Sequence, residues 1–143
     1  MSSTRCQTMI ELTDEPLDPT AILALVADDD CGAQIIFLGC TRRTTGEKIT
    51  QQLTYQAYRS MAISELRGLA EKAANRWNLR RLAIYHRLGE VAVGQASVAI
   101  AAASPHRPDV MAAIPWLMDR LKETVPIWKQ ETFADGSSAW IHP

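Results

Sequence analysis

Apolar positions recur along this 143-residue chain with two different spacings, every second residue in some segments and once per helical turn in others. Short apolar or alternating runs bounded by Gly, Pro, Asn or Asp predict β-strands. Such runs occupy residues 7–12, 32–39, 49–58, 79–88, 96–103, 127–133 and 138–141. The polar stretch 40–48 is predicted to be a mobile loop, residues 89–94 a turn, and Asp135-Gly136 the turn of a closing hairpin.

Three other segments have the apolar spacing of amphipathic helices. Asp18 is placed to cap the first of them, with Pro19 at its first helical position. Pro126 ends the third, and Pro115 lies inside it, where a proline is able to kink a helix. The helices are predicted over residues 19–26, 60–78 and 108–124.

The predicted elements follow one another as β-α-β-β-α-β-β-α-β-β. Helices therefore interrupt pairs of strands, which favours an α+β fold over a doubly wound sheet. Strand 49–58 is expected to run antiparallel to strand 32–39. We expect a single compact domain over residues 1–143, with three main helices on a mixed, largely antiparallel sheet.

The composition is that of a globular domain, with 47% hydrophobic and 22% charged residues. The longest apolar runs are far shorter than the ~20 residues that a membrane-spanning helix needs. Residues 1–5 lead into the first strand without the apolar segment of a secretory signal. We therefore expect a soluble protein of the cytoplasm.

The three cysteines are odd in number and widely spaced, which argues for free thiols and against a disulfide framework or a zinc knuckle. Cys40, beside Arg42 and Arg43, is the best thiolate candidate, although a small apolar filler is the commoner role of such a residue. The aspartates at 28–30 lack the ligand spacing of a calcium loop. No cluster of metal ligands is therefore predicted.

The formal net charge of −1 is unevenly distributed along the chain. Residues 1–31 contain one basic and seven acidic residues, whereas the remainder contains 14 basic and nine acidic residues. A chain with a pI near 6.3 that is basic over its last four fifths suits a small anionic ligand better than a long nucleic acid.

Basic residues gather near four predicted strand or helix ends, as Arg42-Arg43, His86-Arg87, His106-Arg107, and Lys122 with Lys129. Residues 104–107 join an apolar strand to a helix, where free backbone N–H groups, a histidine and a guanidinium are able to converge on a phosphate. A lysine among other cations has a depressed pKa, and its neutral amine is a base or nucleophile near pH 7. Two solvated lysines are the alternative for Lys122 and Lys129.

Five segments of the chain occur in the order found in one known family. They are residues 37–42 (FLGCTR), 53–62 (LTYQAYRSMA), 86–89 (HRLG), 104–107 (SPHR) and 121–131 (LKETVPIWKQE). Together they resemble the catalytic (large) subunit of molybdopterin synthase. The resemblance extends over essentially the whole chain from about Gly32 onward, and the stretch KETVPIWK is highly specific.

The resemblance implies a sulfurtransferase of molybdenum cofactor biosynthesis, which converts cyclic pyranopterin monophosphate into the dithiolene molybdopterin. Both sulfur atoms would come from the C-terminal thiocarboxylate of a small ubiquitin-like partner subunit, whose tail enters the active site. Two large subunits would pair through their centre, with a small subunit at each distal end of the heterotetramer. The resemblance implies no cofactor and no metal for this step.

Carried over residue by residue, the resemblance makes Lys122 and Lys129 the catalytic lysines, with Lys122 nearest the thiocarboxylate. It places the substrate phosphate against Arg42, His106 and Arg107. The substrate-binding positions that it implies are Cys40, Thr41, Arg42, His106, Arg107, Gln130 and Glu131.

The chain departs from the family pattern at two positions: Arg43 stands where an asparagine is usual, and Gln56 where a glutamate is common. A second class of function also fits the basic residues. It is a non-catalytic homodimeric module that binds a phosphorylated metabolite, and it requires that Lys122 and Lys129 be dispensable.

Overall fold

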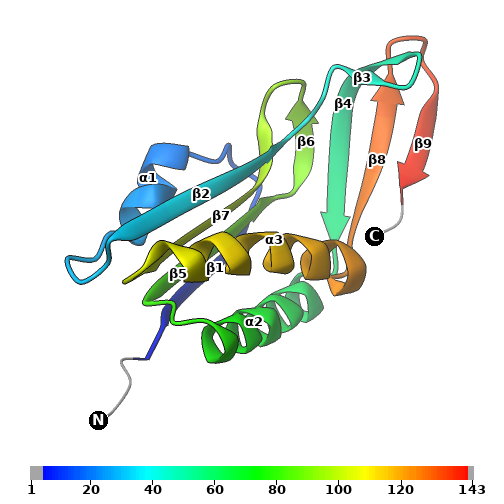
Figure 1. The fold of residues 1–143 in the computed structure, drawn as a ribbon. Coiled ribbons are helices and arrows are strands. Elements are labelled where there is room, and N and C mark those ends of the chain that lie inside the picture. The colour runs from blue at the N-terminus through cyan, green and yellow to red at the C-terminus, as the bar shows by residue number, and fades with distance from the viewer. Residues whose placement is uncertain (1–4, 142–143) are drawn as a thin grey trace.

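The computed structural model describes residues 5–141, in which nine strands and three helices are found (Figure 1). In chain order they are β1 (Gln7–Thr13), α1 (Pro19–Leu25), β2 (Ala33–Cys40), β3 (Thr44–Thr45), β4 (Lys48–Ala57), α2 (Arg59–Arg76), β5 (Arg81–Arg87), β6 (Gly89–Ala92), β7 (Ala96–Ser104), α3 (Arg107–Thr124), β8 (Ile127–Phe133) and β9 (Ser138–Ile141). Residues 1–4, on which the cytoplasmic expectation partly rests, and residues 142–143 lie outside the described residues. Within 5–141, every helix is too short or too polar to cross a membrane.

The strands form two sheets, which stand side by side in Figure 1. The first has the order β1-β5-β7-β2, and the second has the order β3-β4-β8-β9, with β6 also paired to β4. β1 and β5 are parallel, and the other pairs are antiparallel. The predicted α+β class, with three helices and largely antiparallel pairing, is therefore confirmed.

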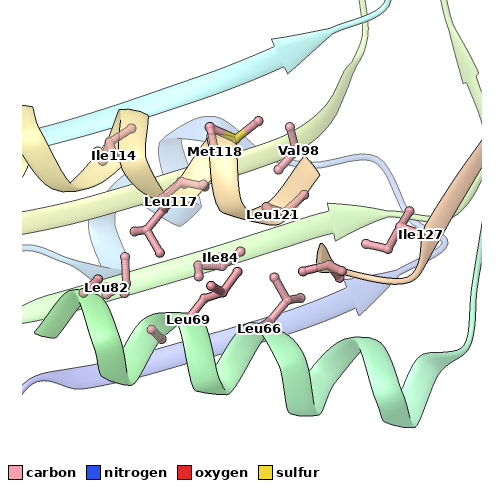
Figure 2. Packing of buried hydrophobic residues seen from close by; sticks show 14 of the residues in the cluster. Leu66, Leu69, Leu82, Ile84, Val98, Ile114, Leu117, Met118, Leu121 and Ile127 are labelled. Carbon is pink, nitrogen blue, oxygen red and sulfur yellow. The ribbon is translucent and has the colours of Figure 1, made fainter. Parts of the chain in front are cut away.

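Helices cover both faces of the first sheet: α2 and α3 on one face and α1 on the other (Figure 1). Side chains alternate between the faces of a strand, so that Leu82 and Ile84 pack toward α2 and α3, whereas Ala83 packs toward α1. Figure 2 shows the larger of the two clusters, in which leucines of α2 meet the apolar face of α3 over the sheet. This packing holds the C-terminal end of α3 against the junction of the two sheets.

Leu66→Ala is expected to destabilise the protein by about 2–5 kcal/mol, because a buried leucine loses its transfer free energy and leaves a cavity. Leu66 is completely buried in the larger cluster. Met61 lies on the same helix but is 56% exposed, so Met61→Ala is the matched control with a small expected effect. Urea unfolding of both variants measures the difference, and equal midpoints would contradict the packing shown in Figure 2.

Three predictions about the strands were wrong. β4 does not pair with β2. It belongs to the second sheet, where it pairs with β3, β6 and β8. The predicted loop 40–48 contains β3, and the predicted turn 89–94 contains β6. Both missed strands are short, with two and four residues, and pair with β4, so that their presence depends on a partner far away in the sequence.

The helix ends follow local signals. Asp18 caps α1, accepting hydrogen bonds from the backbone N–H groups of Thr20 and Ala21 at 3.1 and 3.3 Å, as predicted. α3 continues through Pro115, whose side chain is exposed.

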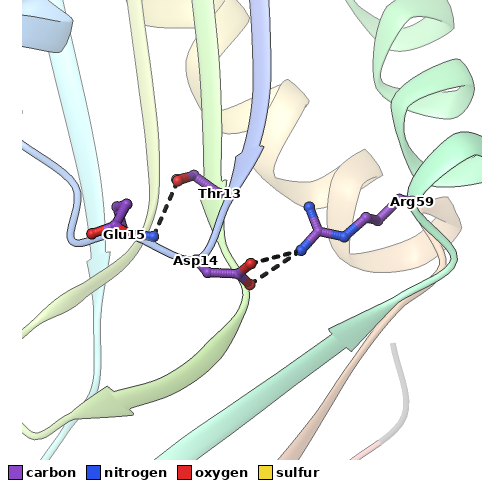
Figure 3. Close-up of polar contacts among 4 residues, drawn as sticks. All are labelled: Thr13, Asp14, Glu15 and Arg59. Carbon is purple, nitrogen blue, oxygen red and sulfur yellow. Dashed lines mark hydrogen bonds and ion pairs between the residues drawn. The ribbon is translucent and has the colours of Figure 1, made fainter.

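At the start of α2, Arg59 donates from one nitrogen to both carboxylate oxygens of Asp14, at 3.0 and 3.1 Å (Figure 3). The pair connects the end of β1 to α2. Both side chains are largely exposed, at 51% and 69%, so the ion pair contributes little to stability.

Candidate active site

A cavity of about 500 Å³ opens where the two sheets meet the C-terminal end of α3. Its walls come from seven strands, the segment after β2, and the C-terminal part of α3. The polar side chains that line it are Cys40, Thr41, Arg42, Thr45, Thr50, Tyr55, His86, Ser97, Lys122, Lys129 and Glu131. Apolar side chains, including Phe37 and Met118, complete the lining.

Two lysines from different elements meet at this cavity. Lys122 is exposed in the last turn of α3, and Lys129 is half-buried on β8, beyond the proline that ends the helix. Burial is the main cause that lowers the pKa of Lys129, and the positive charges of Lys122 and Arg42 lower it further against the opposing charge of Glu131. Near neutral pH, Lys129 therefore loses its proton to form a neutral amine more easily than an exposed lysine does.

Glu131 lies on the same face of β8 as Lys129, and its carboxylate accepts hydrogen bonds from two hydroxyl groups. Thr45 and Thr50 donate to Oε2 at 2.6 and 2.5 Å. Burial raises the pKa of Glu131, but these two hydrogen bonds and the charges of Lys129 and Arg42 outweigh it, so that the net pKa is lowered. An ionised Glu131 therefore fastens the β3–β4 hairpin to β8 and balances the cations beside it.

The segment that carries Arg42 is anchored through its neighbour Thr41. The backbone N–H of Thr41 donates to Gln95 at 3.0 Å, and its carbonyl accepts from Gly94 at 2.9 Å. Its side chain is 3% exposed, and its hydroxyl donates to the Val91 carbonyl at 3.5 Å. Thr41 thus holds the start of the segment, while Arg42 lines the cavity.

His106 and Arg107 lie at the other end of α3 from the lysines. His106 precedes the helix, and Arg107 is its first residue, whereas Lys122 is in its last turn. At a rise of 1.5 Å per residue, the 16 residues from His106 to Lys122 span about 24 Å. Both side chains are exposed and do not line the cavity, so the structure does not bring them to Lys122 within one chain. The His106 side chain makes no capping hydrogen bond, which leaves helix N–H groups available to an anion.

The remaining family positions point elsewhere. Gln130 alternates with Lys129 along β8, is absent from the cavity wall and donates to Ser138 at 3.2 Å. Arg43 and Gln56, where the chain departs from the family, are exposed and do not line the cavity. Neither departure alters the lining of the cavity.

Sequence reasoning left several cavity residues out of the predicted site. Tyr55 is the cross-strand partner of Lys129, and its hydroxyl donates to Ser97 at 3.1 Å. Thr45 and Thr50 lie in a segment predicted in part as a loop. His86 belongs to one of the basic groups at strand ends, but its surroundings in the sequence do not distinguish it from a structural histidine.

The fold and the cavity define an α+β protein with a small cation-rich pocket between two sheets. The structure shows no group of three or more His, Cys, Asp or Glu residues within 5–141 that is placed to hold a metal ion. With Lys122, Lys129 and Arg42 in its lining, the pocket has the charge that suits a small anionic ligand.

This chain belongs to the MoaE protein family, whose model matches residues 12–124. It is 42% identical over 134 residues to the molybdopterin synthase catalytic subunit of Culex quinquefasciatus, which covers 92% of this chain and 85% of that relative. It is 41% identical over 133 residues to the Drosophila melanogaster protein of the same name, again covering 92% of this chain. The chain spans only 36% of the length of that Drosophila relative.

Solved structures show the same fold. The molybdopterin synthase of Staphylococcus aureus superposes with a TM-score of 0.87 and 32% identity, covering 93% of this chain and 96% of that chain. The molybdopterin biosynthesis MoaE protein of Burkholderia ambifaria has a TM-score of 0.78 and 30% identity, covering 94% and 89%. A complex of subunits 1 and 2 of molybdopterin-converting factor from Helicobacter pylori, at 21% identity and a TM-score of 0.73, supports the fold alone.

Proposed function

We propose that this protein is the catalytic subunit of molybdopterin synthase, a sulfurtransferase of the cytoplasm. It would convert cyclic pyranopterin monophosphate into molybdopterin with two sulfur atoms from the C-terminal thiocarboxylate of a small ubiquitin-like partner subunit. The observation that carries the proposal is the cavity in which Lys122, Lys129 and Arg42 converge, in a chain of this family.

The two lysines differ in exposure, and this difference suggests different roles. Lys122 is exposed at the cavity. Its ammonium form would meet an incoming thiocarboxylate first and polarise it, and its neutral amine form would deprotonate groups during sulfur attack. Lys129 is half-buried with a lowered pKa, which suits a second acid/base or the stabilisation of a charged intermediate. Glu131 acts as a positioning residue, because its carboxylate holds Thr45 and Thr50.

The substrate phosphate needs cations that a single chain does not supply in one place. Arg42 lies at the cavity, but His106 and Arg107 are about 24 Å from Lys122 along α3. We propose that two copies of this chain pair so that His106 and Arg107 of one copy complete the cavity of the other. This homodimer would form the centre of a heterotetramer with two small subunits.

One assay tests the proposed function directly. The purified protein is mixed with a thiocarboxylated small subunit and cyclic pyranopterin monophosphate, and dithiolene product is measured. We expect product only when all three are present. Binding of the pterin without product formation would favour the non-catalytic module that binds a phosphorylated metabolite.

Cys40→Ser is expected to retain most of the activity, because both sulfur atoms arrive on the partner subunit and no thiol of this chain needs to become a persulfide. Cys40 is exposed at the cavity, so the expected stability loss is about 1 kcal/mol or less. Cys6 and Cys31 are half-buried, and burial raises the pKa of both thiols, which keeps them protonated. The variant that replaces all three cysteines should therefore remain active as well.

Activity and thermal unfolding of the Cys40→Ser protein are measured separately. A folded variant with a loss of activity above about a hundredfold would show that Cys40 takes part in the chemistry. A persulfide on Cys40 during turnover, detected by mass spectrometry, would lead to the same conclusion.

A further inference from the structure

A buried histidine at the wall of the cavity has no role in the function proposed above. His86 is 4% exposed and belongs to β5, on the strand face that packs toward α2 and α3. Its ring meets the ring of Tyr55 edge to face, with centroids 4.9 Å apart and planes at 69°. Tyr55 is in turn the cross-strand partner of Lys129, and all three residues line the cavity. His86 therefore lies beside the proposed reaction site.

The hydrogen-bond polarity of the His86 ring is fixed by its neighbour. Nδ1 lies 2.8 Å from the carbonyl oxygen of Arg87. A carbonyl oxygen only accepts, so Nδ1 carries the proton, and Nε2 of the neutral ring is an acceptor. No residue within 5–141 donates to Nε2. Because His86 lines the cavity, Nε2 is the polar atom of the ring that is left to meet a ligand there.

The His86 ring is also neutral near neutral pH. Burial is the main cause that lowers the pKa of His86 to about 4; the hydrogen bond to Arg87 opposes the shift, and the positive charge of Lys129 adds to it. The nearby hydroxyl of Tyr55 is already donated to Ser97. Near neutral pH, Nε2 is thus an acceptor that still needs a donor.

We propose that His86 is a further substrate-binding residue, whose Nε2 accepts a hydrogen bond from an N–H or O–H group of the bound pterin and selects for a donor at that position. The identity of the ligand rests on the proposed function. Pterins carry both ring and exocyclic N–H donors, which fits an acceptor in the cavity wall. A ligand that presents an acceptor at that position would place its lone pair against the lone pair of Nε2 and would bind more weakly.

Two substitutions separate the roles of the two ring nitrogens. His86→Asn keeps an amide N–H near the position of Nδ1 for the Arg87 carbonyl but has no atom at the position of Nε2. His86→Gln extends its amide toward the position of Nε2 and restores an acceptor. We expect His86→Asn to raise the KM for cyclic pyranopterin monophosphate about tenfold with kcat nearly unchanged. His86→Gln should recover most of this loss, and a wild-type KM in His86→Asn would overturn the proposal.

A second measurement uses the unchanged protein, so that it does not depend on whether a variant folds. The ¹⁵N resonances of the His86 ring are recorded with and without saturating cyclic pyranopterin monophosphate, in the absence of the small subunit. We expect the Nε2 resonance to shift and the Nδ1 resonance to stay; an unmoved Nε2 resonance would overturn the proposal. Failure of the wild-type protein to form product with thiocarboxylated partner would instead reject the proposed function, whatever the histidine spectrum shows.

Discussion

Lys129→Met is expected to lower kcat by about a hundredfold or more, because it removes the amine proposed for acid/base work while the apolar stem is retained. Lys129→Arg is the companion variant, since a guanidinium keeps the positive charge and cannot exchange a proton at neutral pH. If Lys129 transfers a proton, both variants lose activity. If it only stabilises charge, the arginine variant keeps a large part. Near-normal turnover by Lys129→Met would remove this residue from the mechanism.

The pH dependence follows from the lowered pKa of Lys129. If the neutral amine is the active form, kcat/KM rises as the pH passes through this lowered pKa and then levels off. Lys122→Ala removes one of the positive charges that lower it, so the pKa of Lys129 should move back toward the ordinary value for lysine. Side-chain NMR titration of Lys129 measures this shift even in an inactive variant, and an unchanged pKa would contradict the proposed coupling.

Protein stability distinguishes lost chemistry from a lost fold in Lys129→Met. Because the pKa of Lys129 is lower in the folded chain, the unfolded chain binds this proton more tightly, and protonation opposes folding. Wild-type stability should therefore rise as the pH increases from the lowered pKa toward the ordinary pKa of lysine, and Lys129→Met should lack this rise. At neutral pH the Tm of Lys129→Met should equal or exceed that of wild type. A lower Tm would contradict the conclusion that protonation of Lys129 opposes folding.

Complementation between two inactive chains is the second large effect that we expect. Lys122→Ala and Arg107→Ala each damage a cavity, but their residues lie at opposite ends of α3. In a dimer that shares its sites, a mixed pair places both lesions in one cavity and leaves the other cavity intact. Differently tagged copies, co-expressed and purified through both tags, should therefore have about half of the wild-type activity.

The matched control pairs Lys122→Ala with Lys129→Met. Both residues line the same cavity of one chain, so the mixed dimer has no intact site and should stay inactive. Activity is measured at a substrate concentration below the KM, because the loss in Arg107→Ala is mainly one of binding. Absence of recovery in the first pair would contradict the exchange of His106 and Arg107 between copies.

Most elements were predictable because periodicity and capping are local properties of the chain. The buried face of α2, with Ala62, Leu66 and Ala73, follows from helical spacing alone. Asp18 and Pro19 mark the start of α1 in the same way. The β8–β9 hairpin was predicted correctly, because its turn at Asp135-Gly136 is a local signal. The pairing of the distant strands was not predictable, since the alternation along β4 shows that one face is buried but not which strand lies beside it.

The site was predictable in part. Lys122 and Lys129 flank Pro126 in the sequence, and the turn that this proline imposes carries both to one cavity. The distance of His106 from Lys122 was already implied by the helix predicted over residues 108–124, because an α-helix rises by a constant amount per residue. A phosphate that contacts both Arg42 and His106 of one chain would conflict with that length, and the proposed pairing of two copies would remove the conflict.

The helices, most of the strands and the types of residue around the lysines follow from the amino-acid sequence, because each depends on residues nearby along the chain. Which of these residues face one another depends on how the two sheets and the helices pack. Glu131 meets Thr50 across 81 residues and Thr45 across 86 residues. His86 becomes a neutral acceptor because the fold buries it beside Tyr55. Hydrogen bonds and desolvation act over a few ångströms in space, and separation along the chain carries no information about such distances until the two sheets have packed.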